Sequence, residues 1–120
     1  MKVRPGLGES HPSETVAAEH VRLFNEAVSS GWWEPFIDTF ATDAELEFIG
    51  VPAGPFVGRP AIAQAYRANP PDDTIAIDGA ARREGDAIAV PYRWNRTNEK
   101  GTMRLTHKDG LITKLVVTFG

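Results

Sequence analysis

The hydrophobic periodicity of this chain changes from helical to strand-like near residue 74. Residues 13–30 place their apolar side chains on one arc of a helix and their polar side chains on the opposite arc. Residues 87–95 instead alternate apolar and polar positions, as a half-buried strand does. Because helical segments precede a run of strands, the order predicts an α+β domain in which a curved sheet wraps around the helices.

The boundaries of the expected elements follow from the same patterns and from the helix-breaking residues between them. Ser13 is placed to cap the first helix, and Gly31 is placed to end it. Gly79 indicates a bulge in its strand, and Pro91 indicates either a sheet edge or a bulge. Helices are predicted over 13–30, 34–40 and 60–68, and strands over 44–49, 74–83, 87–95, 102–106 and 111–119.

The length of 120 residues is enough for one domain, which we predict over 13–120. A chain of this size buries roughly 65% of its surface on folding, so it can build a core with a small cavity inside it. Residues 1–12 contain two prolines and two glycines and are predicted to form a flexible tail.

The composition argues against several classes of function. The net charge is -3 with no basic cluster, so nucleic acid is not an expected partner. The sequence has no cysteine, and its three histidines share no metal-ligand spacing, so neither a disulfide nor a metal site is expected. No stretch approaches the ~20 apolar residues of a membrane span, and no signal peptide is recognisable. We therefore expect a cytoplasmic protein with no metal, no cofactor and no membrane partner.

A family resemblance rests on three stretches: VRLFNEAVSSGWWEPFIDTFATDAELEF at 21–48, GPFVGRPAIAQAYRANPPDD at 54–73 and LITKLVVTFG at 111–120. In order and spacing the sequence resembles the nuclear transport factor 2-like superfamily, in particular its SnoaL-like and ketosteroid-isomerase-like members. The resemblance covers about 13–120. It implies a cone-shaped domain, a cystatin-like α+β roll, in which an antiparallel or mixed sheet wraps around three N-terminal helices and leaves an apolar cavity. It also implies a homodimer formed through the outer face of the sheet.

The resemblance also locates the residues that the isomerase branch uses for catalysis. That branch has an Asp base on its first strand, and a Tyr and a protonated Asp hold the developing oxyanion. In this sequence the base falls at Phe48, the tyrosine at Phe24, and the acid at Gly101 or Thr102. None of these residues matches, so the resemblance implies that the isomerase machinery is absent.

The two glutamates beside Phe48 are weak candidates for catalysis. Strand periodicity places Leu46 and Phe48 on one face and Glu45 and Glu47 on the other. If the apolar pair faces the cavity, both carboxylates face solvent or a partner. A solvated face is the favoured interpretation, because glutamate is rarely buried.

His20 is the sharpest candidate for chemistry, since it lies in the apolar arc of the first helix. Two interpretations stay open. One is a core histidine hydrogen-bonded to backbone, Tyr66 or water. The other is a general base or a ligand-binding group, because the pKa of a free imidazole, about 6.5, lies near working pH. Tyr66 and Tyr92 are expected in the core, with hydroxyls that could reach a ligand. Trp32 and Trp33 either cover the cavity mouth or pack beneath the second helix.

Three functions are compatible with these patterns. The first is a binding protein for a small hydrophobic molecule of polyketide-, steroid- or terpenoid-like character. The second is a cofactor-independent isomerase, cyclase or hydrolase that uses His20 with Tyr66 or Tyr92 as acid and base. The third is a dimerisation or interaction module whose cavity is filled by its own side chains. The predicted pocket residues are Phe24, Phe36, Phe40, Phe48, Phe56, Tyr66, Val90, Tyr92, Trp94 and Phe119.

Overall fold

The structure, a computed structural model, describes residues 12–119, and describes side chains from residue 15 onward. Its elements are α2 (Pro12–Ser30), α3 (Glu34–Ile37), β1 (Phe40–Ile49), β2 (Phe56–Val57), α4 (Arg59–Ala68), β3 (Ile75–Ile77), β4 (Arg82–Glu84), β5 (Ala87–Trp94), β6 (Lys100–Lys108) and β7 (Leu111–Phe119). Apart from Pro12, which begins α2, the predicted tail lies outside the described residues.

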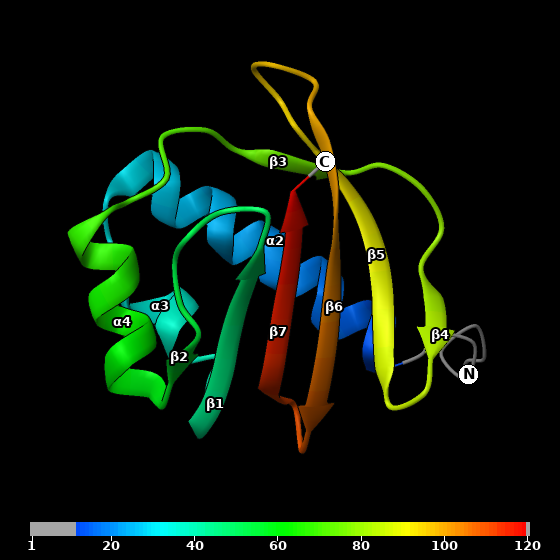
Figure 1. Cartoon of the computed structure of the whole chain (residues 1–120), viewed down its shortest axis with the longest axis horizontal. Coiled ribbons are helices and arrows are strands. Elements are labelled where there is room, and N and C mark those ends of the chain that lie inside the picture. The colour runs from blue at the N-terminus through cyan, green and yellow to red at the C-terminus, as the bar shows by residue number, and fades with distance from the viewer. Residues whose placement is uncertain (1–11, 120) are drawn as a thin grey trace, which may run out of the picture.

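The strands form one curved mixed sheet in the order β2-β1-β7-β6-β5-β3, and β4 also pairs with β5. β1 and β7 run parallel, and the other pairs run antiparallel. α2 crosses one face of the sheet, and α3 and α4 lie near β1 (Figure 1). The predicted α+β class, with a curved mixed sheet and three helices, is confirmed. No helix in the described part of the chain is long and apolar enough to cross a membrane. The cytoplasmic location and the homodimer stay predictions.

Side-chain alternation selects the face of the sheet that meets the helices. Leu46 of β1, Leu115 of β7 and Leu105 of β6 lie opposite one another in register, and all three are fully buried. Ile88 of β5 continues the row. Burial of four such side chains removes apolar surface from water, which stabilises the fold by about 1.5–3 kcal/mol for each of them.

The predicted second helix and first strand have different boundaries in the structure. The helix predicted over 34–40 ends at Ile37, and Phe40 is instead the first residue of β1. The hydroxyl of Thr39 donates to the carbonyl of Phe36 at 2.6 Å, and the N–H of Ile112 on β7 donates to the carbonyl of Thr39 at 2.8 Å. Pairing with β7 therefore extends the strand at the expense of the helix.

The prediction of one continuous strand over 74–83 was wrong, because the structure has two short strands there, β3 and β4. Both parts pair with β5, and the gap between them lies opposite Pro91. The carbonyl of Pro91 accepts from the N–H of Asp78 at 2.8 Å, so the missing N–H of the proline faces the same gap. A Cβ at Gly79 would lie 3.0 Å from Cγ of Pro91. Pro91 thus marks an interruption of the ladder, not an edge of the sheet.

Asn25 joins α2 to β3, although helical periodicity places it on the polar side of the helix. Its side-chain N–H₂ donates to the carbonyl of Ile75, and its oxygen accepts from the N–H of Ile75, each at 2.9 Å. The amide therefore replaces the strand neighbour that this edge lacks. Ile75 is buried, so these two backbone groups have little access to water.

We expect Asn25→Ala to lower the free energy of unfolding by about 2 kcal/mol, because two backbone groups of a buried residue lose their partners. Ser29→Ala, at an exposed position of the same helix, is the matched control and should change it by no more than about 0.5 kcal/mol. Urea unfolding of the three proteins measures both values. Equal stabilities for Asn25→Ala and the wild type would show that the amide does not hold β3.

Candidate functional site

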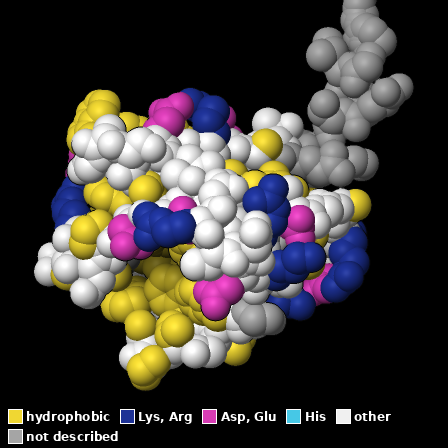
Figure 2. Space-filling model, turned by 90° about the horizontal axis from the view of Figure 1, so that it is seen from above, with side chains coloured by type: hydrophobic (Ala, Val, Ile, Leu, Met, Phe, Trp, Pro, Cys, Tyr) yellow, Lys and Arg dark blue, Asp and Glu magenta, His cyan; other side chains and the backbone are white. Residues whose placement is uncertain are grey.

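A cavity of about 560 Å³ lies between the sheet and the helices. This volume falls within the range of about 300–1,000 Å³ that is usual for small-molecule sites. Figure 2 shows hydrophobic side chains gathered in a hollow on the face seen from above. No Asp, Glu, Lys or Arg belongs to the cavity wall in the described part of the chain. The wall is therefore uncharged as well as apolar.

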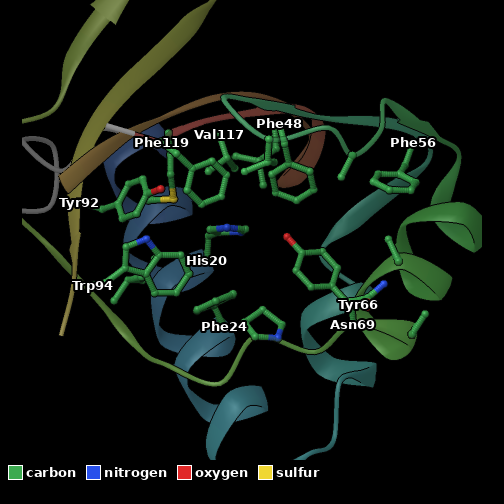
Figure 3. A pocket seen from close by; sticks show the side chains of 18 of the residues that line it. His20, Phe24, Phe48, Phe56, Tyr66, Asn69, Tyr92, Trp94, Val117 and Phe119 are labelled. Carbon is green, nitrogen blue, oxygen red and sulfur yellow. The ribbon is translucent and has the colours of Figure 1, made fainter. Parts of the chain in front are cut away.

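The structure brings most of the predicted pocket residues together. Three of them, Phe36, Phe40 and Val90, lie in the core behind the wall. Seven of them line the cavity, and Figure 3 shows them around it: Phe24, Phe48, Phe56, Tyr66, Tyr92, Trp94 and Phe119.

Several wall residues were not among the predicted ones. Met103 and Val117 follow the same strand alternation that predicted the others, so periodicity could have found them. The apolar residues Val51 and Ala53 come from a connection with no periodic pattern. Asn69 lies just after α4, and only the three-dimensional structure brings it to the cavity.

Aromatic rings form an arc along one side of the cavity. Trp94 and Phe119 are stacked, with ring centroids 6.4 Å apart and planes 8° from parallel. Phe48 lies 6.0 Å from Phe119, and Phe56 lies 6.3 Å from Phe48. Phe24 extends the arc at 6.2 Å from Trp94. Such rings offer large rigid apolar surfaces at little cost in side-chain entropy.

Gly101 allows Tyr92 to lie close against the sheet. The two residues are opposite one another in β5 and β6. A Cβ at position 101 would lie 2.6 Å from the hydroxyl oxygen of Tyr92, and it would also collide with the carbonyl oxygen of Thr118. The phenol of Tyr92 therefore fills the space that a side chain at position 101 would need.

His20 reaches the cavity wall from α2, and only 3% of its surface is exposed. Its ring packs against Phe36 at 5.0 Å and against Phe40 at 6.2 Å. Nδ1 has no hydrogen-bond partner among the residues that the structure describes. Burial lowers the pKa of His20 to about 4. The imidazole is therefore neutral at ordinary pH, with one ring nitrogen as donor and the other as acceptor.

Tyr66 and Tyr92 bring two phenols to the cavity. Tyr66 is stacked on Trp33 at 5.1 Å, and burial raises the pKa of its hydroxyl. Burial also raises the pKa of Tyr92, to about 12, although a hydrogen bond with Trp94 acts in the opposite direction. The hydroxyl of Tyr92 donates to the carbonyl of Thr118 at 3.4 Å. Both phenols are therefore uncharged at neutral pH.

Figure 3 shows the imidazole of His20 and the hydroxyl of Tyr66 pointing toward one another. The two rings also pack on the same neighbour, since each has its centroid 5.0 Å from that of Phe36. A neutral imidazole and a neutral phenol in the wall of an apolar cavity can donate and accept hydrogen bonds. They could also exchange a proton with a bound molecule.

The remaining sequence candidates lie away from the cavity. Trp33 is buried against Phe36 and Tyr66, whereas Trp32 is 65% exposed, and neither belongs to the wall. Glu45 and Glu47 are half-buried and do not line the cavity. No group of His, Cys, Asp and Glu in 12–119 is arranged to hold a metal ion.

We expect the buried imidazole to make stability depend on pH. The pKa of His20 is about 4 in the folded protein and about 6.5 in an unfolded chain. Between these values the unfolded chain binds more protons, so stability falls as pH falls. When the pH is lowered from about 7 to about 5, the free energy of unfolding should fall by about 2 kcal/mol more for the wild type than for His20→Leu. Urea unfolding at both pH values tests this, and equal losses in the two proteins would contradict it.

The comparisons with known proteins give matches among solved structures. No protein-family model and no curated protein matches the sequence. An NTF2-like protein from Anabaena variabilis ATCC 29413 is 16% identical, with a TM-score of 0.67 over 92% of this chain and 93% of its own. A Kribbella flavida DSM 17836 protein, provisionally described as a ketosteroid isomerase, is 20% identical, with a TM-score of 0.65 over 90% of this chain and 79% of its own. A Sinorhizobium meliloti protein, provisionally described as a polyketide cyclase, is 22% identical, with a TM-score of 0.59 over 82% of this chain and 93% of its own.

These proteins share an architecture with the chain at identities below 25%, and one architecture supports many activities. The resemblance found in the sequence is confirmed at the level of the fold. The chain has the fold of the NTF2-like superfamily.

Proposed function

We propose that the chain binds a small hydrophobic molecule, of polyketide-, steroid- or terpenoid-like character, in the cavity between sheet and helices. The observation that carries this proposal is the uncharged, largely apolar wall around about 560 Å³ of space. Transfer of apolar ligand surface from water to such a wall contributes roughly 25 cal/mol per Å². The aromatic arc supports the same conclusion, because it presents flat surfaces to the cavity.

The structural neighbours give weaker support. Two of them are provisionally described as a ketosteroid isomerase and a polyketide cyclase, which are names for proteins that act on such molecules. At such low sequence identity the likeness supports a common fold only. The ligand of this chain has to be inferred from its own cavity.

Blocking the cavity should weaken binding without unfolding the protein. Ala65 lies on α4 at the wall, so Ala65→Phe places a ring in the space that a ligand would occupy. Ala18→Phe is the matched control, because Ala18 is exposed on α2 and does not line the cavity. A panel of fused-ring and terpenoid-sized molecules is titrated while the emission of Trp94 is followed. We expect saturable quenching for the wild type and Ala18→Phe, with affinity at least about tenfold weaker for Ala65→Phe.

A flat response from the wild type across the whole panel would contradict the proposal. It would favour the third function considered from the sequence, an interaction module. Trp32 and Trp33 lie outside the wall, so their emission is a background signal. The variant Trp94→Phe measures that background, because it retains only these two tryptophans.

Catalysis is the second candidate function, and the imidazole of His20, which points toward the hydroxyl of Tyr66, favours it (Figure 3). In this hypothesis His20 acts as general base, and Tyr66 or Tyr92 acts as acid, in an isomerase, cyclase or hydrolase reaction without a cofactor. Because the pKa of His20 is about 4, the base form is present at all higher pH values. Turnover of the best ligand should therefore fall only as pH drops toward about 4.

The acid–base hypothesis requires that His20→Leu abolish turnover even at saturating concentrations of the ligand. A pH–rate profile for the wild type and the variant measures this. Turnover that persists in His20→Leu would eliminate His20 as the base and leave binding as the function.

A further inference from the structure

A buried polar atom of His20, a residue of the cavity wall, lacks a hydrogen-bond partner within the part of the chain that the structure describes. Nδ1 of His20 is buried and has no hydrogen-bond partner among the described residues. A buried polar group without a partner costs about 1–3 kcal/mol, and such groups are uncommon in native proteins. The inference below rests on the proposed binding function, because it assigns the imidazole of His20, which lines the cavity, a partner within the bound molecule.

The surroundings of His20 leave the cavity as the place from which a partner can come. On the core side the imidazole packs against the rings of Phe36 and Phe40, which offer no hydrogen-bonding atom. On the cavity side the hydroxyl of Tyr66 points toward it (Figure 3). The two polar groups come from different helices, α2 and α4, and pack on the same ring of Phe36.

The chemistry of the two groups selects the kind of atom that fits between them. Neutral imidazole offers one donor and one acceptor, and a phenol can both donate and accept. A ligand hydroxyl also donates and accepts, so it satisfies both groups whichever tautomer His20 adopts. A carboxylate only accepts, and it would enter a wall with no Lys or Arg among its described residues. Removing its water without a counter-charge costs far more than the same transfer of a hydroxyl.

We propose that His20 and Tyr66 form a recognition site for an uncharged hydroxyl of the ligand, so that the cavity selects neutral hydroxylated hydrophobic molecules over the corresponding carboxylates. The aromatic arc holds the ring system of the molecule, and the two polar groups hold its oxygen. The hydroxyl of Tyr92 lies against Thr118 and is already engaged there.

Three probes with one ring system test the proposal by isothermal titration calorimetry at about pH 7.4. The probes are 2-naphthol, 2-naphthoate and naphthalene, which differ in the polar group alone. We expect the wild type to bind 2-naphthol about 5- to 10-fold more tightly than naphthalene, as one or two net hydrogen bonds provide. It should bind 2-naphthoate at least about 100-fold more weakly than 2-naphthol.

Variants locate the effect at the two residues. His20→Leu and Tyr66→Phe should each reduce the preference for 2-naphthol over naphthalene to about twofold or less. His20→Gln restores a donor and an acceptor and should recover much of the preference. Circular dichroism and thermal unfolding confirm that each variant is folded, and the wild-type comparison of the three probes stands without any variant.

The outcomes separate this inference from the proposed function. If the wild type binds all three probes equally, or prefers naphthoate, the hydroxyl site is overturned while a binding cavity remains. A preference for naphthol that survives in both His20→Leu and Tyr66→Phe would overturn the assignment to these residues. If the wild type binds none of the three probes and nothing in the wider panel, the hydroxyl site and the binding function both fall.

Discussion

The packing around the ring of Phe36 supports the helical layer and the two polar residues of the cavity wall, His20 and Tyr66. This ring is fully buried, and five aromatic rings lie within 5.8 Å of its centroid: His20, Phe24, Trp33, Phe40 and Tyr66. These rings come from α2, α4, β1 and the connection that contains α3. One side chain of a four-residue helix therefore sets the positions of elements that are far apart in the sequence. Close packing of this kind transmits small volume changes, because interiors contain few voids that could absorb them.

Phe36 also fixes the relation between the two polar groups of the cavity. Their ring centroids each lie 5.0 Å from that of Phe36, and Figure 3 shows the imidazole of His20 and the hydroxyl of Tyr66 pointing toward one another. Burial then keeps both groups uncharged, by lowering the pKa of the imidazole and raising that of the phenol. The expected loss of stability in acid and the proposed selection of uncharged ligands thus have the same physical cause, the poor solvation of charge around these two residues.

The sheet contributes a second constraint, where Tyr92 of β5 lies opposite Gly101 of β6. The family resemblance locates a catalytic acid at Gly101 or Thr102. In the structure the phenol of Tyr92 lies where a side chain at 101 would be, so glycine and tyrosine are matched across β5 and β6.

The sequence by itself determined the α+β class, the approximate positions of the helices and strands, and the inward faces of β1 and β5, because these depend on the local period of apolar side chains. Tertiary structure decided the rest. The end of α3 depends on pairing between Thr39 and β7, and the role of Asn25 depends on an unpaired strand edge fifty residues away. Periodicity predicts that Phe36 is buried, but it does not predict whether the side chain lines the cavity or packs against other rings in the core. Whether a buried side chain lines a cavity is a property of its neighbours from other elements, which no local pattern in the sequence records.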